Sequence, residues 1–140
     1  MYAHPLPEHL CGIVVHGIDI VEIGDFQRML QTPLREQLAM TFTERELKEC
    51  EQNERSAERL AGRFATKEAV LKALGLGFGD GVAFTDVETI NEVTGAPRVL
   101  VHRLVAVRAK EYSVDEWFVS TSHSSSIAIA SVIGARRLPK

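Results

Sequence analysis

The sequence predicts an α+β fold in a single domain, with a mainly antiparallel sheet wrapped around one long central helix. Two observations carry this prediction. Apolar residues recur at helical spacing over residues 59–72, and short runs rich in β-branched residues lie toward both ends of the chain. A strand, then several helices, then strands with one helix between them is an order typical of α+β domains. The 140 residues, 45% of them hydrophobic, suffice for one core.

The first predicted element is a buried strand over residues 12–23, GIVVHGIDIVEI. Asp19 interrupts its apolar run, and Gly17, two residues earlier, would let another backbone or a ligand come close. A lone aspartate at the end of a strand most often accepts hydrogen bonds from backbone amides, so a structural role for Asp19 stays open. Residues 25–40 follow helical spacing, and Pro33 divides them into two short helices.

A third short helix is predicted over residues 43–50, because Thr43 and Glu46 have the spacing of a capping box. The central helix over residues 59–72 follows. It ends in a glycine-rich stretch, GLGFGDG, over residues 75–81. Glycines at this position most often cap the helix, although their amides could also approach a phosphate.

One carboxylate interrupts the apolar stripe of the central helix. Leu60, Phe64 and Leu71 form the stripe, and Glu68 falls within it, with Lys72 one turn later at its edge. Burying an unpaired carboxylate is costly. We therefore expect a cation, a proton or a strong hydrogen-bond donor beside Glu68.

The second half of the chain is predicted to be mainly β-structure. The expected elements are a strand over 82–91, a turn over 94–97, a strand over 98–101, and a hairpin formed by 116–122 and 127–134. Residues 103–112 favour a helix by composition, although their valines would also suit a strand.

Composition and charge exclude several classes of protein. A formal net charge of −3 disfavours binding to nucleic acid or to an anionic membrane through bulk charge. Cys11 and Cys50 have the spacing of neither a zinc site nor a disulfide scaffold. The first ten residues lack Lys and Arg, and the apolar run after them is broken by His16 and Asp19, so neither a signal peptide nor a membrane span is expected. These features predict a soluble, cytoplasmic protein.

Four blocks of sequence carry a resemblance to a known family. They are GIDIVEI, LAGRFATKEAVLKALGLG, DVETINEVTGAPRV and WFVSTSHSSSIAIA. In order and spacing they resemble the bacterial holo-acyl-carrier-protein synthases of the 4'-phosphopantetheinyl transferase superfamily over residues 12–130. The resemblance implies a transferase domain over residues 12–136, between a leader at 1–11 and a tail at 137–140.

The resemblance also implies an activity. Members of this family move the phosphopantetheine arm of coenzyme A to a serine hydroxyl of an acyl carrier protein, release adenosine 3',5'-bisphosphate and require magnesium. By resemblance, Asp19 and Glu68 are the Mg²⁺ ligands, and oxygen ligands suit this hard cation. Glu68, directly or through a metal-bound water, is the candidate acceptor of the serine proton. Lys72 would stabilise charge on the leaving group, unless it forms only a surface ion pair with Glu68 worth about 0.3–0.5 kcal/mol.

A second set of residues is implied to bind coenzyme A. Arg63 would contact the ribose phosphate, and a guanidinium suits phosphate oxygens. His123 could instead be a general base or a solvated turn residue, and Gly95 and Pro97 would suit any hairpin turn. The full predicted set is Arg63, Lys67, Gly95, Pro97, Ser120, Ser122 and His123.

The implied protein partner is an acyl carrier protein, which is acidic. The docking residues expected by resemblance are Phe26, Arg28, Met29 and Arg35. The sequence departs from the family at Asp25, where a basic residue is common. Arg35 could equally lie on a solvated helix surface.

A homotrimer with active sites between subunits is also implied by the resemblance. Gly62, Ala65 and Ala69 leave a second face of the central helix smooth enough for close packing. Two other functions remain as alternatives. A magnesium-dependent phosphohydrolase would cleave a nucleotide diphosphate linkage without a carrier, and a non-catalytic carrier-binding module would tolerate the loss of Glu68.

Overall fold

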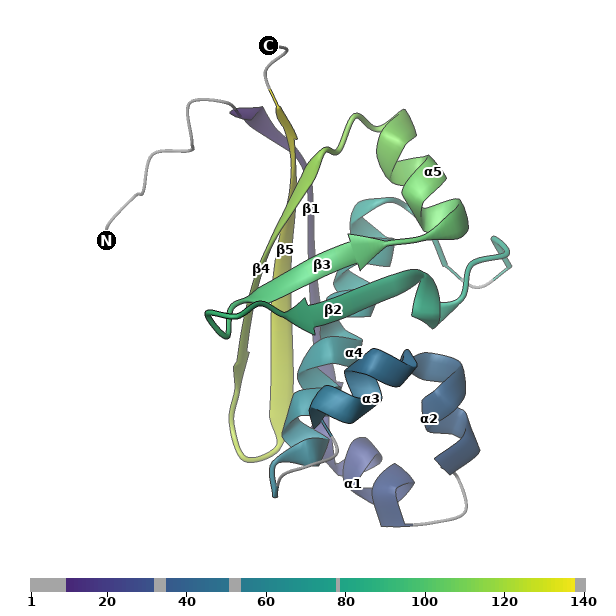
Figure 1. Ribbon diagram of the computed structural model, residues 1–140, viewed down its shortest axis with the longest axis vertical. Helices are drawn as coiled ribbons and strands as arrows, with labels where there is room; N and C mark the ends of the chain where they lie inside the picture. Colours follow the sequence, from purple (N-terminus) through teal and green to yellow (C-terminus); the bar gives the residue numbers. More distant parts are fainter. Residues whose placement is uncertain (1–9, 32–34, 51–53, 78, 138–140) are drawn as a thin grey trace.

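The computed structural model describes residues 10–31, 35–50, 54–77 and 79–137. A long helix packs against the inner face of a three-stranded sheet, and short helices surround it (Figure 1). The elements in chain order are β1 (Leu10–Glu22), α1 (Ile23–Gln31), α2 (Arg35–Thr41), α3 (Glu44–Cys50), α4 (Ser56–Ala73), the 3₁₀ turn η1 (Phe84–Asp86), β2 (Val87–Asn91), β3 (Pro97–Val101), α5 (Arg103–Glu111), β4 (Glu116–His123) and β5 (Ile127–Arg137).

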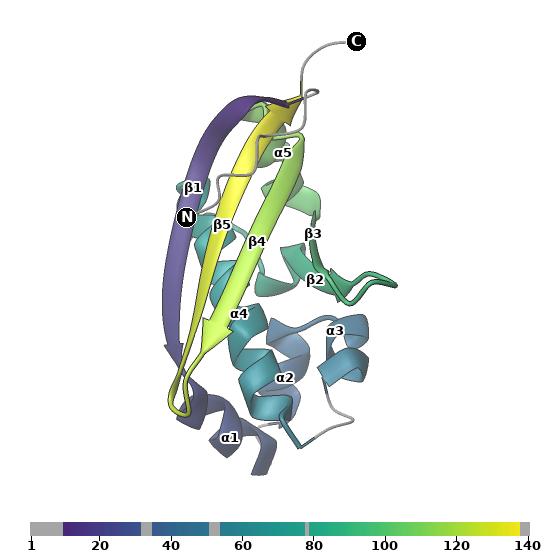
Figure 2. The same cartoon turned by 90° about the vertical axis from the view of Figure 1, so that its left-hand side faces the viewer.

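The β-structure forms two antiparallel sheets. In the larger sheet β5 lies between β1 and β4, and Figure 2 shows the three strands side by side with α4 behind them. The smaller sheet is the β2–β3 hairpin. In the larger sheet Ala130 of β5 pairs with Asp19 on one side and with Thr121 on the other, so the register links Asp19 to the β4–β5 hairpin. The predicted α+β class is therefore confirmed, with the strands divided between two sheets.

The predicted strand over residues 82–91 is shorter in the structure, because β2 begins at Val87. The residues before it form η1. The Asp86 carboxylate accepts a hydrogen bond from the Ala83 N–H at 2.9 Å, which favours a turn over an extended strand.

The helix α4 is central because both parts of the core include it. Toward its N-terminal end it packs with α1, α2 and α3 around the aromatic side chains of Phe26, Phe42 and Phe64. Toward its C-terminal end Val70, Leu71 and Leu74 contact the sheets and α5. The helical stripe predicted from Leu60 and Leu71 is buried as expected, at 0% and 5% exposure.

Two local predictions from the sequence are confirmed. The Thr43 N–H donates to the Glu46 carboxylate at 2.9 Å, and the Glu46 N–H donates to the Thr43 hydroxyl at 3.2 Å, which is a capping box. At the end of α4, Gly75 adopts a φ of 67°, and the next N–H, of Leu76, donates to the Leu71 carbonyl at 2.8 Å. This glycine therefore caps the helix.

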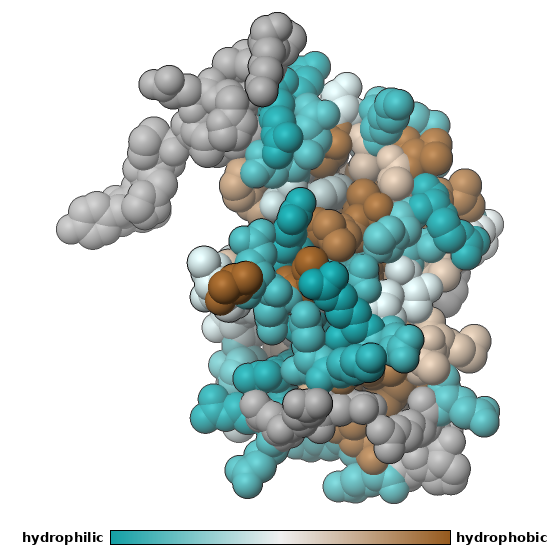
Figure 3. All heavy atoms as spheres, in the orientation of Figure 1, coloured by the Kyte–Doolittle hydropathy of each residue, from teal (hydrophilic) through white to brown (hydrophobic). Residues whose placement is uncertain are grey.

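The surface is mixed in character. Figure 3 shows hydrophilic residues over most of the face that carries α3 and the β2–β3 hairpin, with apolar groups scattered among them. Large apolar side chains are exposed on β1, where Ile13, Ile18 and Ile20 are 58%, 50% and 61% exposed.

Within the described ranges, no helix has the length and apolar character needed to cross a membrane.

Candidate functional site

Asp19, Glu68 and Lys72 lie together where β1 crosses α4. Gly17 makes this crossing close, because a Cβ atom at this position would lie 2.0 Å from the carbonyl oxygen of Ala69. Two residues further along β1, the Asp19 carboxylate accepts a hydrogen bond from the Lys72 ammonium at 2.5 Å. The strand thus brings Asp19 to Glu68 and Lys72 of the helix, although Asp19 and Lys72 lie 53 positions apart in the sequence.

The electrostatics of this cluster follow from its partial burial. Burial raises the pKa of Glu68, the nearby charge of Asp19 raises it further, and the Lys72 ammonium offsets part of the increase. The hydrogen bond to Asp19 raises the pKa of Lys72. The cation expected beside Glu68 is therefore Lys72, whose ion pair is formed with Asp19 across the strand–helix contact.

An apolar pocket of about 720 Å³ opens beside Glu68. Its wall combines Glu68 and Leu71 of α4 with Met29 of α1. The other side is lined by Leu76, Gly77, Val82, Ala83 and Phe84. A mostly apolar cavity with one carboxylate is suited to hold an extended, weakly polar group next to that carboxylate.

A second pocket, of about 320 Å³, lies against a different face of α4. It gathers five of the residues predicted to bind coenzyme A from three separate elements, namely Arg63, Gly95, Pro97, Ser122 and His123. Gly95 has a φ of 85°, so the turn between β2 and β3 needs a glycine there. Ser120 is exposed on β4 and is not part of the lining. We call this the arginine pocket.

The arginine pocket contains residues that the sequence reading missed. Arg55 and Arg59 line it together with Arg63. The spacing of four residues could have identified them, because it places all three side chains on one face of a helix. Glu58 also lines the pocket, and its Oε2 lies 3.7 Å from Nε2 of His123.

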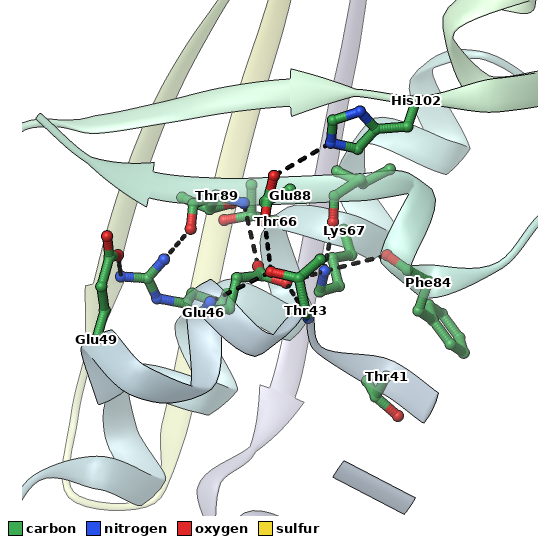
Figure 4. Close-up of polar contacts among 12 residues, drawn as sticks. Thr41, Thr43, Glu46, Glu49, Thr66, Lys67, Phe84, Glu88, Thr89 and His102 are labelled. Atoms are coloured by element: carbon green, nitrogen blue, oxygen red, sulfur yellow. Dashed lines mark hydrogen bonds and ion pairs between the residues drawn. The ribbon is translucent and has the colours of Figure 1, made fainter. Parts of the chain in front are cut away.

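Arg63 is held firmly in the pocket wall. Its guanidinium donates to the Glu49 carboxylate of α3 at 2.8 Å and to the carbonyl oxygen of Thr89 in β2. Figure 4 shows Glu49 on α3 pointing toward the strand that carries Thr89. The residue is 7% exposed, so its position is fixed by the protein before any ligand binds.

Lys67 requires a correction. Adjacent to Glu68 in the sequence, it was expected to reach a phosphate, but its side chain is fully buried. Its ammonium donates to the Glu46 carboxylate at 2.7 Å, to the Phe84 carbonyl at 3.1 Å and to the Val87 carbonyl. These three acceptors use all three N–H groups of a lysine. Lys67 is therefore a core residue of the network in Figure 4 and lines neither pocket.

The expected docking residues lie on α1 and at the start of α2, and they differ in burial. Phe26 is 3% exposed and packs edge-on against Phe42, so it belongs to the core and cannot meet a partner directly. Arg28 is exposed and forms an ion pair with Asp25. Met29 is half-buried at the rim of the apolar pocket. Arg35 begins α2, and its side chain lies outside the described residues.

The small-residue face of α4 is covered within the chain itself. Ala65 and Ala69 are fully buried, and Ala69 lies against Gly17 of β1. At Ala69 this face therefore packs on β1 of the same chain, so Ala65 and Ala69 are not available to a neighbouring subunit, whereas Gly62 is half-buried and lines the arginine pocket.

Comparison with known proteins decides the family. The sequence model of the 4'-phosphopantetheinyl transferase superfamily matches residues 16–130. The chain belongs to this superfamily. The match to the superfamily spans Asp19, Glu68 and Lys72 as well as the lining of the arginine pocket.

Individual relatives agree with the superfamily match. The chain is 38% identical over 117 residues to a holo-[acyl-carrier-protein] synthase of Geobacter sulfurreducens, covering 84% of this chain and 93% of that protein. It is 44% identical over 124 residues to a holo-[acyl-carrier-protein] synthase of Streptomyces avermitilis, covering 87% and 97%. A solved holo-(acyl-carrier-protein) synthase of Bacillus anthracis, in complex with CoA (3',5'-ADP), superposes with a TM-score of 0.70 at 32% identity, covering 89% of this chain and 97% of that one.

Proposed function

We propose that this superfamily member transfers the 4'-phosphopantetheine group of coenzyme A to a serine hydroxyl of an apo acyl carrier protein, and releases adenosine 3',5'-bisphosphate. The observation that carries the proposal is the meeting of Asp19, Glu68 and Lys72 at the β1–α4 crossing. These groups supply two carboxylates that can bind a metal ion and one exposed lysine that can stabilise negative charge, all beside a pocket. Phosphoryl-transfer sites use groups of these kinds.

The carboxylates fit a magnesium ion. Asp19 and Glu68 would be its protein ligands, because their charges interact at the β1–α4 crossing beside Lys72. Mg²⁺ commonly binds through one or two carboxylates together with water and substrate phosphates. When bound, the ion would offset negative charge on the diphosphate of coenzyme A.

The remaining chemistry belongs to the side chains. Glu68 is the proposed acceptor of the serine proton, and in the metal-free protein burial raises its pKa. The Lys72 side chain is 55% exposed, so it can leave Asp19 and place its ammonium beside the leaving phosphate.

The arginine pocket is the proposed site for the nucleotide part of coenzyme A. Arg63 and His123 supply donors for phosphate oxygens, and Gly95, Pro97 and Ser122 line the remaining wall. Ser120 is a further candidate contact on the neighbouring part of β4. Lys67 is omitted because its donors are already used in the core.

A homotrimer with active sites between subunits is part of the proposal. Glu68 and the arginine pocket lie in separate parts of one chain, because the two pockets share no lining residue. A neighbouring subunit would bring one chain's carboxylates to another chain's arginine pocket. The exposed apolar side chains of Ile13, Ile18 and Ile20 on β1 are a surface that such a contact would cover.

The acyl carrier protein is proposed to dock near α1 through Arg28, Met29 and Arg35. Asp25 neutralises part of the charge of Arg28, so the attraction to an acidic carrier is weaker than an unpaired arginine would give. An Arg28→Glu variant should bind the carrier more weakly and with less dependence on salt. Unchanged affinity and salt dependence would refute this docking site.

Intact-mass measurement tests the proposed function. Apo carrier protein, coenzyme A and Mg²⁺ are incubated with the enzyme, and the carrier should gain the mass of one phosphopantetheine. Consumption of coenzyme A without a carrier would instead indicate a phosphohydrolase. Transfer that survives Glu68→Gln would contradict the assigned chemistry.

We propose the cytoplasm as the location, and the buried free thiol of Cys50 suits a reducing compartment.

A further inference from the structure

We infer that Glu49 is a positioning residue for the nucleotide site, acting through Arg63. This inference rests on the proposed use of coenzyme A. Glu49 does not line the arginine pocket, but Arg63, Thr89 and Asn91 do, and its carboxylate bonds directly to two of these three residues.

The contacts of Glu49 join three elements at one carboxylate. From α3 it accepts a hydrogen bond from the Arg63 guanidinium of α4 at 2.8 Å. It also accepts the Asn91 N–H of β2, at 3.2 and 3.4 Å for its two oxygens. Because a backbone amide holds the carboxylate in place, the carboxylate in turn holds the guanidinium in a fixed orientation.

The same arrangement occurs one turn earlier on α3. Glu46 accepts the Thr89 N–H at 3.1 Å and the Lys67 ammonium at 2.7 Å. Each of the two glutamates on α3 thus accepts one backbone N–H of β2 and binds one cation of α4. Glu46 binds Lys67, and Glu49 binds Arg63, one turn away on the same helix. Figure 4 shows both glutamates on α3 facing β2. Glu46 holds a cation in the core, whereas Glu49 holds one in a pocket wall.

Charge and geometry predict opposite effects for the loss of Glu49. Its negative charge competes with a phosphate for Arg63, so its removal would strengthen phosphate binding if charge dominated. Its hydrogen bonds orient Arg63, so its removal would weaken binding if orientation dominated. We expect orientation to dominate, because the Arg63 side chain is 9% exposed and its second contact, the Thr89 carbonyl, does not fix both ends of the guanidinium.

The experiment compares coenzyme A with 3'-dephospho-coenzyme A in carrier-modification kinetics. In Glu49→Ala, KM for coenzyme A should rise about tenfold while kcat stays within about twofold of wild type. KM for 3'-dephospho-coenzyme A should not change, because that substrate lacks the phosphate that Arg63 is proposed to bind. A purely structural defect would affect both substrates alike.

Two further variants complete the design. Glu49→Gln keeps an acceptor oxygen for Arg63 without the charge, so it should restore KM to within about threefold of wild type, and it carries the test if the alanine variant does not fold. Glu111→Ala is the matched control, because it removes a carboxylate bonded to Arg108 at 3.2 Å on α5, away from both pockets.

The outcomes are distinct. A KM for coenzyme A that falls or stays constant in Glu49→Ala would overturn the inference. An equal rise in KM for both substrates would also overturn it, as would an equal rise in KM for coenzyme A in the alanine and glutamine variants. Absence of transfer by the wild-type enzyme would refute the proposed function instead.

Discussion

Gly17 of β1 and Ala69 of α4 meet with no room for a side chain between them. A Cβ at Gly17 would lie 2.0 Å from the Ala69 carbonyl oxygen and 3.2 Å from the Ala73 Cβ. The nearest atoms belong to the backbone of α4 and not to the end of a flexible side chain, and Ala69 is fully buried, so a Cβ at Gly17 would require β1 to move away. This contact therefore fixes how close β1 comes to α4, and with it how Asp19 lies relative to Glu68 and Lys72.

We expect Gly17→Ala to destabilise the protein by about 1–3 kcal/mol, the usual cost of overpacking a core. Displacement of β1 should also weaken the Asp19–Lys72 contact and lower activity. Urea unfolding measures the first effect and carrier modification the second. Gly62→Ala is the control for stability, since a Cβ there meets no atom within 4 Å and alanine favours a helix by roughly 0.5–1 kcal/mol. Equal stabilities for the two variants would contradict the close contact.

The buried pair of Glu46 and Lys67 makes a second prediction. Burial lowers the pKa of Lys67, and the Glu46 carboxylate opposes that shift. Lys67→Met should cost about 3–5 kcal/mol, because it leaves the Glu46 charge buried without a partner. Glu46→Gln added to Lys67→Met should recover part of this loss, because it removes the buried charge while its one amide oxygen can still accept either the Thr43 or the Thr89 N–H.

Thermal and urea unfolding of the single and double variants provide the measurement. The double variant should be more stable than Lys67→Met alone. If it were less stable, the cost of Lys67→Met would not come from an unpaired charge on Glu46.

The sequence predicts the elements of this fold well where a local pattern defines them. The stripe of Leu60, Phe64 and Leu71 identifies α4, and the Thr43–Glu46 spacing identifies the start of α3. The chemistry of the Asp19–Glu68–Lys72 cluster was also accessible, because a carboxylate on an apolar stripe needs a partner. Each of these signals lies within a few residues of sequence or in a family motif.

What the sequence could not predict depends on contacts between distant elements. Helical spacing shows that Lys67 points away from Glu68, but it does not show that α3 and β2 cover that side with acceptors. The same limit applies to Phe26, which α2 and α4 bury. Residues 82–86 alternate like a strand, but Phe84–Asp86 form η1, where the Asp86 N–H donates to the Ala83 carbonyl and the Asp86 carboxylate accepts the Ala83 N–H.

Glu88 gives a prediction for stability against pH. Burial would raise its pKa, but hydrogen bonds from the Thr43 hydroxyl at 2.5 Å and from His102 at 3.2 Å outweigh burial and lower it. A lowered pKa means that the folded state prefers the ionised carboxylate. Its stabilisation is therefore present above the unfolded-state pKa, about 4.3, and is lost as the pH falls through the folded-state value.

Glu88→Gln should accordingly destabilise the protein by about 1 kcal/mol at pH 7 and by much less near pH 3. Urea unfolding of wild type and variant across this range measures the difference. A destabilisation that is independent of pH would show that the loss comes from shape and not from ionisation.

The last prediction concerns Glu68 and Asp19. Burial is the main cause of the raised pKa of Glu68 and the Asp19 charge is the next, while Lys72 lowers it. In metal-free protein, Asp19→Asn should lower the Glu68 pKa for two reasons. It removes the repelling charge, and it frees the Lys72 ammonium from Asp19 to move toward Glu68. Carbon-13 NMR of the labelled Glu68 carboxyl follows the titration directly.

The direction of this shift also has a consequence for Mg²⁺. A carboxylate must be ionised to bind a metal, and Glu68 becomes protonated at a higher pH than an ordinary glutamate. As the pH is lowered, affinity for Mg²⁺ should therefore begin to fall at a higher pH than it would with an ordinary glutamate. Glu111→Gln, which changes a carboxylate on the surface of α5, should leave the Glu68 titration unaltered. If Asp19→Asn left the Glu68 pKa as unchanged as Glu111→Gln does, Asp19 and Glu68 would not interact electrostatically. The proposed metal site between Asp19 and Glu68 would then have to be abandoned.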